Sequence, residues 1–159
     1  MRIGVDIDGV LTDLSSFLFD YAIDFYKEKG IDMVNPRGYE VKEMFNITED
    51  LVYEFWVKYL PKYFSMPPRR KAAEIIKKLQ MEGNYIVIIS ARGSGKDEDT
   101  LGKESTEYVT DKWLSMYGFD PDLVLFTDAF VDKNYKKSHA DKLCNNIFRA
   151  NCLQLFFKL

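Results

Sequence analysis

The alternation of short apolar runs with segments of helical periodicity constrains the fold of this chain most. Mostly apolar runs of the kind that form buried strands lie at residues 1–5, 85–89 and 123–126. Between them, apolar residues recur every three or four positions, as on one face of a helix. Buried strands that alternate with helices are typical of a parallel sheet. The sequence therefore predicts an α/β fold, a Rossmann-like parallel sheet with helices on both faces.

Length, charge and cysteine content narrow the class of protein further. A chain of 159 residues fits one domain, since single cores usually serve about 100–200 residues. A net charge of −3 argues against a surface that collects bulk nucleic acid. Cys144 and Cys152 form no Cys-x-x-Cys pair, so no zinc site is predicted. The apolar runs are far shorter than the ~20 residues of a membrane span, and no signal-peptide pattern is present, which favours a cytoplasmic protein.

The helical segments are bounded by residues that commonly start or end helices. Thr48 and Ser105 or Thr106 are predicted caps, and Pro61 is predicted to end the helix that Thr48 begins. The predicted helices begin near residues 14, 48, 72 and 105 and end at Gly30, Pro61, Gly83 and Gly118. A further helix is predicted within 132–151 and a last strand at 152–157, while residues 31–47 show no period.

The segment between the first strand and the helix before the second strand is longer than a simple crossover requires. Residues 14–67 hold two predicted helices, whereas one helix is enough to connect parallel strands. Ligands of open α/β folds bind outside the carboxyl ends of the strands. We therefore expect residues 14–67 to be a small helical cap that stands over this edge, inserted into a single domain of residues 1–159.

The strongest chemical signal is a pair of aspartates after the first strand. Asp6 and Asp8 are two residues apart, and Gly9 follows them directly. Two carboxylates this close repel each other, so the arrangement is favourable when a divalent cation neutralises one and the other keeps a proton to donate. Gly9 lets the backbone turn sharply and bring N–H groups to an anionic ligand. Asp13 is placed instead to be the N-cap of the helix that begins at Leu14.

The longer run Asp6-Ile7-Asp8-Gly9-Val10-Leu11-Thr12-Asp13 resembles the first motif of the haloacid-dehalogenase-like phosphohydrolases, Asp-x-Asp-Gly-x-x-x-Asp after an opening strand. A bare Asp-x-Asp would more simply be a polar strand-to-helix turn, and the longer match favours the functional interpretation. In that family the first Asp takes the phosphoryl group and the second is the general acid and base. The resemblance implies these roles for Asp6 and Asp8.

A second match follows the strand at residues 85–89. The run Ile89-Ser90-Ala91-Arg92 resembles the second motif of the family, in which a Ser or Thr after an apolar strand hydrogen-bonds the transferring phosphoryl group. The resemblance implies a catalytic and phosphate-binding role for Ser90 and a phosphate site that includes Gly9 and Ala91. Arg92 is predicted either to bind a phosphate bidentately or to pair with a structural acid.

The third and fourth motifs are less distinct. The third is a Lys before the fourth strand, where its ammonium offsets phosphate charge, and Lys133 and Lys142 are both candidates. The fourth places acidic residues after the last strand, where they complete the Mg²⁺ site that the resemblance assigns to Asp6 and Asp8. The run at 155–159 holds no carboxylate, so we expect weak Mg²⁺ binding. Three explanations stay open: the chain is truncated, its last residues derive from a shifted reading frame, or another acid such as Asp128 or Asp132 substitutes, in which case binding would be tight.

The first motif, the helical insertion and Ile89–Arg92 are most similar to the small 5'-nucleotidase branch, which includes the 5'(3')-deoxyribonucleotidases. This implies a magnesium-dependent phosphomonoesterase that cleaves a small phosphorylated substrate, a nucleoside monophosphate, through an aspartyl-phosphate intermediate. One alternative is a phosphate-ligand binding or interaction module with an impaired metal site. Another is a phosphotransferase or phosphonate-cleaving relative, which would need a different environment of the nucleophile or a Lys in the insertion. Aromatic residues of the insertion are candidates to stack on a base, although helical spacing more often serves packing. They are Phe17, Tyr21, Phe45, Phe55, Trp56 and Tyr59.

Overall fold

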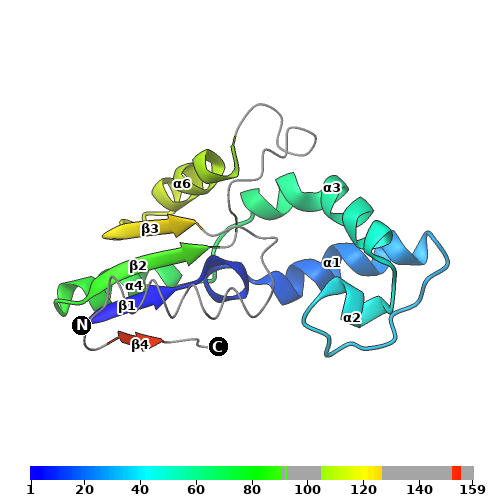
Figure 1. Ribbon diagram of the computed structural model, residues 1–159, viewed down its shortest axis with the longest axis horizontal. Helices are drawn as coiled ribbons and strands as arrows, with labels where there is room; N and C mark the ends of the chain where they lie inside the picture. The colour runs from blue at the N-terminus through cyan, green and yellow to red at the C-terminus, as the bar shows by residue number, and fades with distance from the viewer. Residues whose placement is uncertain (91, 93–104, 127–151, 155–159) are drawn as a thin grey trace.

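The computed structural model describes residues 1–90, 92, 105–126 and 152–154. Within these residues the centre of the molecule is a parallel sheet made of β1 (Arg2–Val5), β2 (Tyr85–Ser90), β3 (Leu123–Phe126) and β4 (Cys152–Gln154). The strand order is β3-β2-β1-β4, so β1 and β2 are central neighbours (Figure 1). The prediction of a mixed α/β fold with a parallel sheet is confirmed.

Two helices cover the same face of this sheet. They are α4 (Ala72–Met81) and α6 (Thr106–Met116). The register pairs Ile3 with Ile86 and Val5 with Ile88, so these side chains share one face. That face and the two helices contribute buried residues to one cluster, namely Ile3, Val5, Ile86, Ile88, Ile76, Trp113 and Leu114. The helix predicted within 132–151 lies outside the described residues, so the prediction of helices on the second face stays a prediction.

The helical insertion, residues 14–67, lies beyond the carboxyl ends of the central strands (Figure 1). It contains α1 (Leu14–Lys27), α2 (Val41–Phe45) and α3 (Glu49–Ser65). These helices share a second hydrophobic cluster of Phe17, Leu18, Ala22, Phe25, Tyr26, Val41, Met44, Phe45, Ile47, Phe55, Tyr63 and Phe64. No helix in the described part of the chain combines the length and hydropathy that crossing a membrane requires.

Two predictions for the insertion are wrong. Pro61 does not end its helix, since α3 continues through it to Ser65. A proline inside a helix costs about 3 kcal/mol, but the extra turn buries Tyr63 and Phe64, and each large apolar side chain contributes roughly 1.5–3 kcal/mol. The segment 31–47 is not irregular throughout, because α2 forms where three of its residues can be buried at helical spacing. They are Val41, Met44 and Phe45.

The predicted N-caps of two helices are confirmed by side-chain hydrogen bonds. The Asp13 side chain accepts a hydrogen bond from the Ser16 N–H at 3.3 Å, which makes Asp13 the N-cap of α1. Ser105 likewise accepts from the Tyr108 N–H at 3.2 Å at the start of α6. Thr48 holds the N-cap position of α3, but its side chain makes no capping bond.

Arg69 ties the end of the insertion to its beginning. The Arg69 N–H donates to the Leu11 carbonyl at 2.7 Å, and its Nε donates to the Thr12 carbonyl at 3.3 Å. Its Nη2 also pairs with the Asp13 carboxylate at 3.4 Å. The two ends of the insertion are therefore held together beside the turn that follows β1.

Candidate active site

A single wide helical turn, Ile7–Leu11, connects β1 to the insertion. The Thr12 N–H closes this turn on the Ile7 carbonyl at 3.0 Å. Gly9 has a φ of 80°, which L side chains rarely adopt, and this confirms the predicted sharp turn at that glycine. The Gly9 N–H donates to Thr12 Oγ1 at 3.3 Å, so this amide bonds within the turn. Asp6 and Asp8 flank the start of the turn and are both partly exposed.

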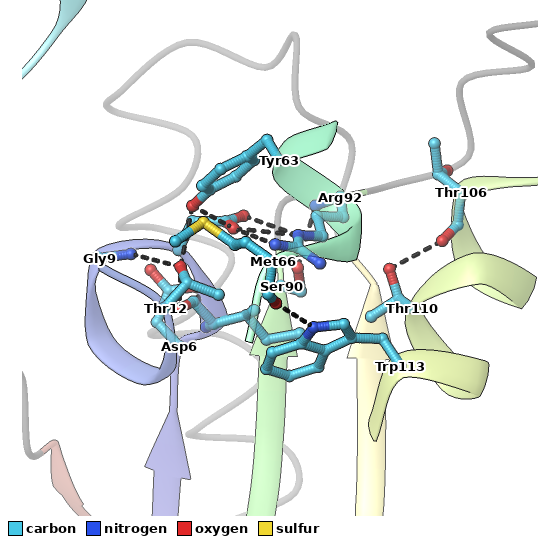
Figure 2. Close-up of polar contacts among 12 residues, drawn as sticks. Asp6, Gly9, Thr12, Tyr63, Met66, Ser90, Arg92, Thr106, Thr110 and Trp113 are labelled. Carbon is cyan, nitrogen blue, oxygen red and sulfur yellow. Dashed lines mark hydrogen bonds and ion pairs between the residues drawn. The ribbon is translucent and has the colours of Figure 1, made fainter. Parts of the chain in front are cut away.

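The structure brings the residues of the two motifs together at one edge of the sheet (Figure 2). Ser90 ends β2, the parallel neighbour of β1, and the carboxyl ends of parallel strands meet at the same edge. Ser90 is fully buried, and its Oγ accepts a hydrogen bond from the Arg92 N–H at 3.1 Å. Asp6 Oδ1 accepts from the Ile7 N–H at 2.7 Å.

Arg92 pairs with Asp8, the predicted catalytic acid and base, whereas a phosphate or a structural acid was predicted as its partner. Arg92 Nη2 lies 2.6 Å from Asp8 Oδ1, and Nε lies 3.0 Å from Oδ1 and 3.1 Å from Oδ2. The Arg92 side chain is only 2% exposed, against 29% for Asp8. A guanidinium with this geometry holds a carboxylate in a fixed orientation.

Aromatic rings surround the Arg92 guanidinium. Its carbon Cζ lies 4.3 Å from the centre of the Phe64 ring, 5.4 Å from that of Tyr63 and 5.8 Å from that of Trp113. These distances allow cation–π attraction. Among the described residues no group hydrogen-bonds to the buried Nη1 of Arg92. A buried donor without a partner lowers the stability of the fold by about 1–3 kcal/mol. An acceptor oxygen of a ligand that bonded Nη1 would remove this cost.

Tyr63 of α3 was not singled out by the sequence analysis, yet it contacts the second aspartate. Its hydroxyl donates to Asp8 Oδ1 at 2.8 Å. The same hydroxyl oxygen lies 2.9 Å from the buried Thr12 Oγ1 (Figure 2). Burial raises the pKa of Tyr63, and the Asp8 carboxylate raises this pKa further, so the phenol keeps its proton and remains a donor. No pattern in the sequence pointed to Tyr63, because the helix was predicted to end at Pro61, two residues before it.

Tyr39 was missed as well, and it brings an exposed aromatic ring to the turn. A Cβ atom on Gly9 would lie 2.9 Å from the Tyr39 hydroxyl, which shows how closely the two residues approach. Tyr39 is 50% exposed. Partial burial raises the pKa of Tyr39, and the nearby carboxylates of Asp6 and Asp8 raise it further.

The six aromatic residues that were candidates to stack on a base pack inside the insertion. The buried ones are Phe17, Phe45 and Phe55, and those packed against them in part are Tyr21, Trp56 and Tyr59. Their rings contact one another, with Phe17 and Tyr21 4.7 Å apart and Phe55 and Trp56 5.1 Å apart between ring centres. Packing, the simpler of the two predicted roles, explains these positions.

Several predicted residues lie outside the described part of the chain. They are Ala91, Asp128, Asp132, Lys133 and Lys142. Within the described residues, no three His, Cys, Asp or Glu side chains gather closely enough to hold a metal ion by themselves.

Comparisons with protein-family models and with curated proteins found no match to this chain. The function proposed below is therefore supported by the resemblance of the two motifs and by the geometry of the residues that carry them.

Proposed function

We propose that this chain is a magnesium-dependent phosphomonoesterase of the haloacid-dehalogenase-like kind, whose substrate is a small phosphorylated molecule such as a nucleoside monophosphate. The observation that carries the proposal is the meeting of Asp6 and Asp8, after β1, with Ser90 and Arg92, after the parallel β2. A nucleophile, a proton donor, a hydroxyl and a cation at one edge are the groups that phosphoryl transfer through a covalent intermediate requires.

The proposed reaction has two steps on Asp6. A carboxylate oxygen of Asp6 attacks phosphorus, the bond from phosphorus to the ester oxygen breaks, and that oxygen takes a proton from Asp8, which releases the alcohol. A water molecule then gives a proton to Asp8, and its oxygen attacks the phosphorus of the aspartyl phosphate. The Asp6 carboxylate and inorganic phosphate are released, and Asp8 again holds a proton.

The donor set at the turn fits Mg²⁺. This ion prefers oxygen ligands, and proteins commonly hold it with one or two carboxylates while several waters remain bound. The Asp6 carboxylate and the Asp8 carbonyl would hold it, because the Asp8 carboxylate is engaged by Arg92 and Tyr63. When bound, Mg²⁺ supplies positive charge that offsets the charge of the phosphoryl oxygens.

The surroundings of Arg92 also support an anionic ligand. Its buried Nη1 receives no hydrogen-bond partner from the residues that the structure describes, and phosphate oxygens are strong acceptors of guanidinium N–H groups. Tyr39 supports a substrate with a planar group, since among the aromatic side chains described at this edge it is the exposed one nearest Gly9.

A hydrolysis assay tests the proposal. The purified chain is incubated with nucleoside 5'-monophosphates and with p-nitrophenyl phosphate, with Mg²⁺ or with excess chelator, and released phosphate is measured. We expect Mg²⁺-dependent hydrolysis that falls by about 10³-fold or more in Asp6→Asn, which keeps the shape of the side chain but lacks the nucleophile. Asp13→Asn is the matched control, because Asn caps α1 as well as Asp does.

Two binding measurements, read together with the hydrolysis assay, separate the enzyme from a binding module. Beryllofluoride with Mg²⁺ mimics an aspartyl phosphate, so it should raise the melting temperature of the wild type and not that of Asp6→Asn. Hydrolysis that Asp6→Asn retains would exclude the proposed nucleophile. Binding of inorganic phosphate without hydrolysis would instead support the non-catalytic module.

A further inference from the structure

We infer that Tyr63 is a positioning residue for Asp8, and that it makes Oδ2 of Asp8 the oxygen that exchanges the proton with the substrate. This inference rests on the proposed function, because it assigns an atom to the proton transfer in that reaction. It goes beyond that function because it assigns to the helical insertion, through Tyr63 of α3, the orientation of the catalytic carboxylate.

The two oxygens of the Asp8 carboxylate have different surroundings. Oδ1 accepts from the Tyr63 hydroxyl at 2.8 Å, from Arg92 Nη2 at 2.6 Å and from Arg92 Nε at 3.0 Å. Oδ2 accepts only from Arg92 Nε, at 3.1 Å, among the described residues. A carboxylate oxygen has two lone pairs, so Oδ1 is saturated and the remaining capacity is on Oδ2.

The Tyr63 side chain is buried, and its hydroxyl contacts Thr12 and Asp8. The side chain is 3% exposed, and its ring packs 4.9 Å from Phe17 and 5.7 Å from Trp56 between ring centres. Thr12 Oγ1 lies 2.9 Å from the hydroxyl oxygen and 3.2 Å from the Ile7 carbonyl, so its one proton can be donated to either, while the Tyr63 hydroxyl donates to Asp8. The resulting chain from Thr12 through Tyr63 to Asp8 fixes the rotation of the carboxylate.

Arg92 and Tyr63 together make the two oxygens of Asp8 different. Arg92 Nε bonds both oxygens at nearly equal distances, whereas Arg92 Nη2 and the Tyr63 hydroxyl each bond Oδ1 alone. The Tyr63 hydroxyl adds this second contact on Oδ1 from the insertion, through α3. Loss of this hydroxyl should therefore harm proton transfer more than it harms binding of the phosphoryl group.

The test compares two leaving groups in the variant Tyr63→Phe. Glycerol 2-phosphate releases an alkoxide that must be protonated as it leaves, whereas p-nitrophenyl phosphate releases a stabilised phenolate that needs little protonation. The measured quantity is kcat/KM, which includes the step in which the ester bond breaks. We expect Tyr63→Phe to lower kcat/KM by about 10-fold or more for glycerol 2-phosphate and by less than about 3-fold for p-nitrophenyl phosphate.

Tyr26→Phe is the matched control. Tyr26 belongs to the same cluster, is 0% exposed and donates to the Leu51 carbonyl at 3.0 Å, so this variant also loses one buried hydroxyl of the insertion. It does not touch Asp8, and any loss of activity should be equal for the two substrates. Circular dichroism melting verifies that each variant is folded at the assay temperature.

A second variant covers the case in which Tyr63→Phe is unfolded. Thr12→Val keeps the Tyr63 ring and removes the hydroxyl that contacts that of Tyr63, and it also removes the acceptor of the Gly9 N–H. A loss that comes from the turn is shared by both substrates and cancels in the ratio of their kcat/KM values, so this ratio should still show the dependence on the leaving group at a smaller size. Equal losses on both substrates in the folded variant would overturn the inference while leaving the proposed function intact. A wild type that hydrolyses neither substrate would overturn both.

Discussion

Arg92 and Asp8, 84 positions apart in the chain, form an ion pair in which Nη2 lies 2.6 Å from Oδ1. The arginine side chain is 2% exposed and the aspartate side chain 29% exposed. A guanidinium removed from water depends on its partner carboxylate for compensation of its charge. In its ionised form Asp8 thus has a structural role at the ends of β1 and β2, and in the proposed reaction the same group takes up and gives up a proton.

Arg92→Lys should destabilise the fold. Lysine keeps the charge but cannot present two nitrogens in one plane to the carboxylate, or place a flat guanidinium against the rings of Phe64 and Trp113. We expect a loss of about 2–4 kcal/mol in the free energy of unfolding, measured with urea. Arg69→Lys is the control, because its pair with Asp13 is wider, at 3.4 Å, and more exposed. That variant should lose less than about 1 kcal/mol, and equal losses in the two variants would contradict this account.

Gly9→Ala should be more destabilising than Gly83→Ala. Both glycines have a φ of 80°, so both variants carry the strain of a left-handed residue, about 1–2 kcal/mol. At Gly83 a new Cβ would meet no atom within 4 Å, whereas at Gly9 it would lie 2.9 Å from the Tyr39 hydroxyl. The difference in unfolding free energy between the variants should shrink when Tyr39→Phe is added. A difference that Tyr39→Phe leaves unchanged would show that this contact is not its cause.

Pro61→Ala should stabilise the protein. Pro61 is exposed and lies inside α3, where it removes one backbone hydrogen bond of the helix. Alanine restores the N–H donor and favours the helix, so we expect a gain of about 1–3 kcal/mol in unfolding free energy. Chemical denaturation measures this gain. An unchanged or lower stability would mean that α3 is already relaxed around the proline.

The stability of the fold should fall above about pH 10, the ordinary pKa of tyrosine. Burial raises the pKa of Tyr26 well above that value, and the Glu54 carboxylate adds to the effect. Above about pH 10 the unfolded chain loses this proton while the folded chain keeps it, so stability decreases by at most about 1.4 kcal/mol per pH unit for this group. Below about pH 10 the group has no effect on the pH dependence.

Urea denaturation between about pH 8 and pH 11 measures this effect. Tyr26→Phe cannot ionise in either state, so its stability should approach that of the wild type as the pH rises through this range. A constant difference between wild type and variant at every pH would contradict the predicted contribution of Tyr26.

The sequence determined the elements of this fold, because their signals are local. Apolar runs and helical spacing predicted the described strands and most of the helices, and Asp13 and Ser105 were identified as caps from the residues beside them. The two motifs also placed Asp6, Asp8 and Ser90 at the ends of strands, and neighbouring parallel strands necessarily bring such ends together.

Tertiary structure alone decided what those residues contact. Asp8 takes its partners from positions 84 and 55 residues away, Arg92 and Tyr63, and no local spacing relates them. Tyr63 reaches Asp8 because burial of its ring and that of Phe64 keeps α3 helical beyond Pro61, against the local preference of the proline. Burial depends on the packing of the whole chain. It can therefore keep a helix intact through a proline and bring together hydrogen-bond partners that no local sequence pattern relates, as with Tyr63 and Asp8.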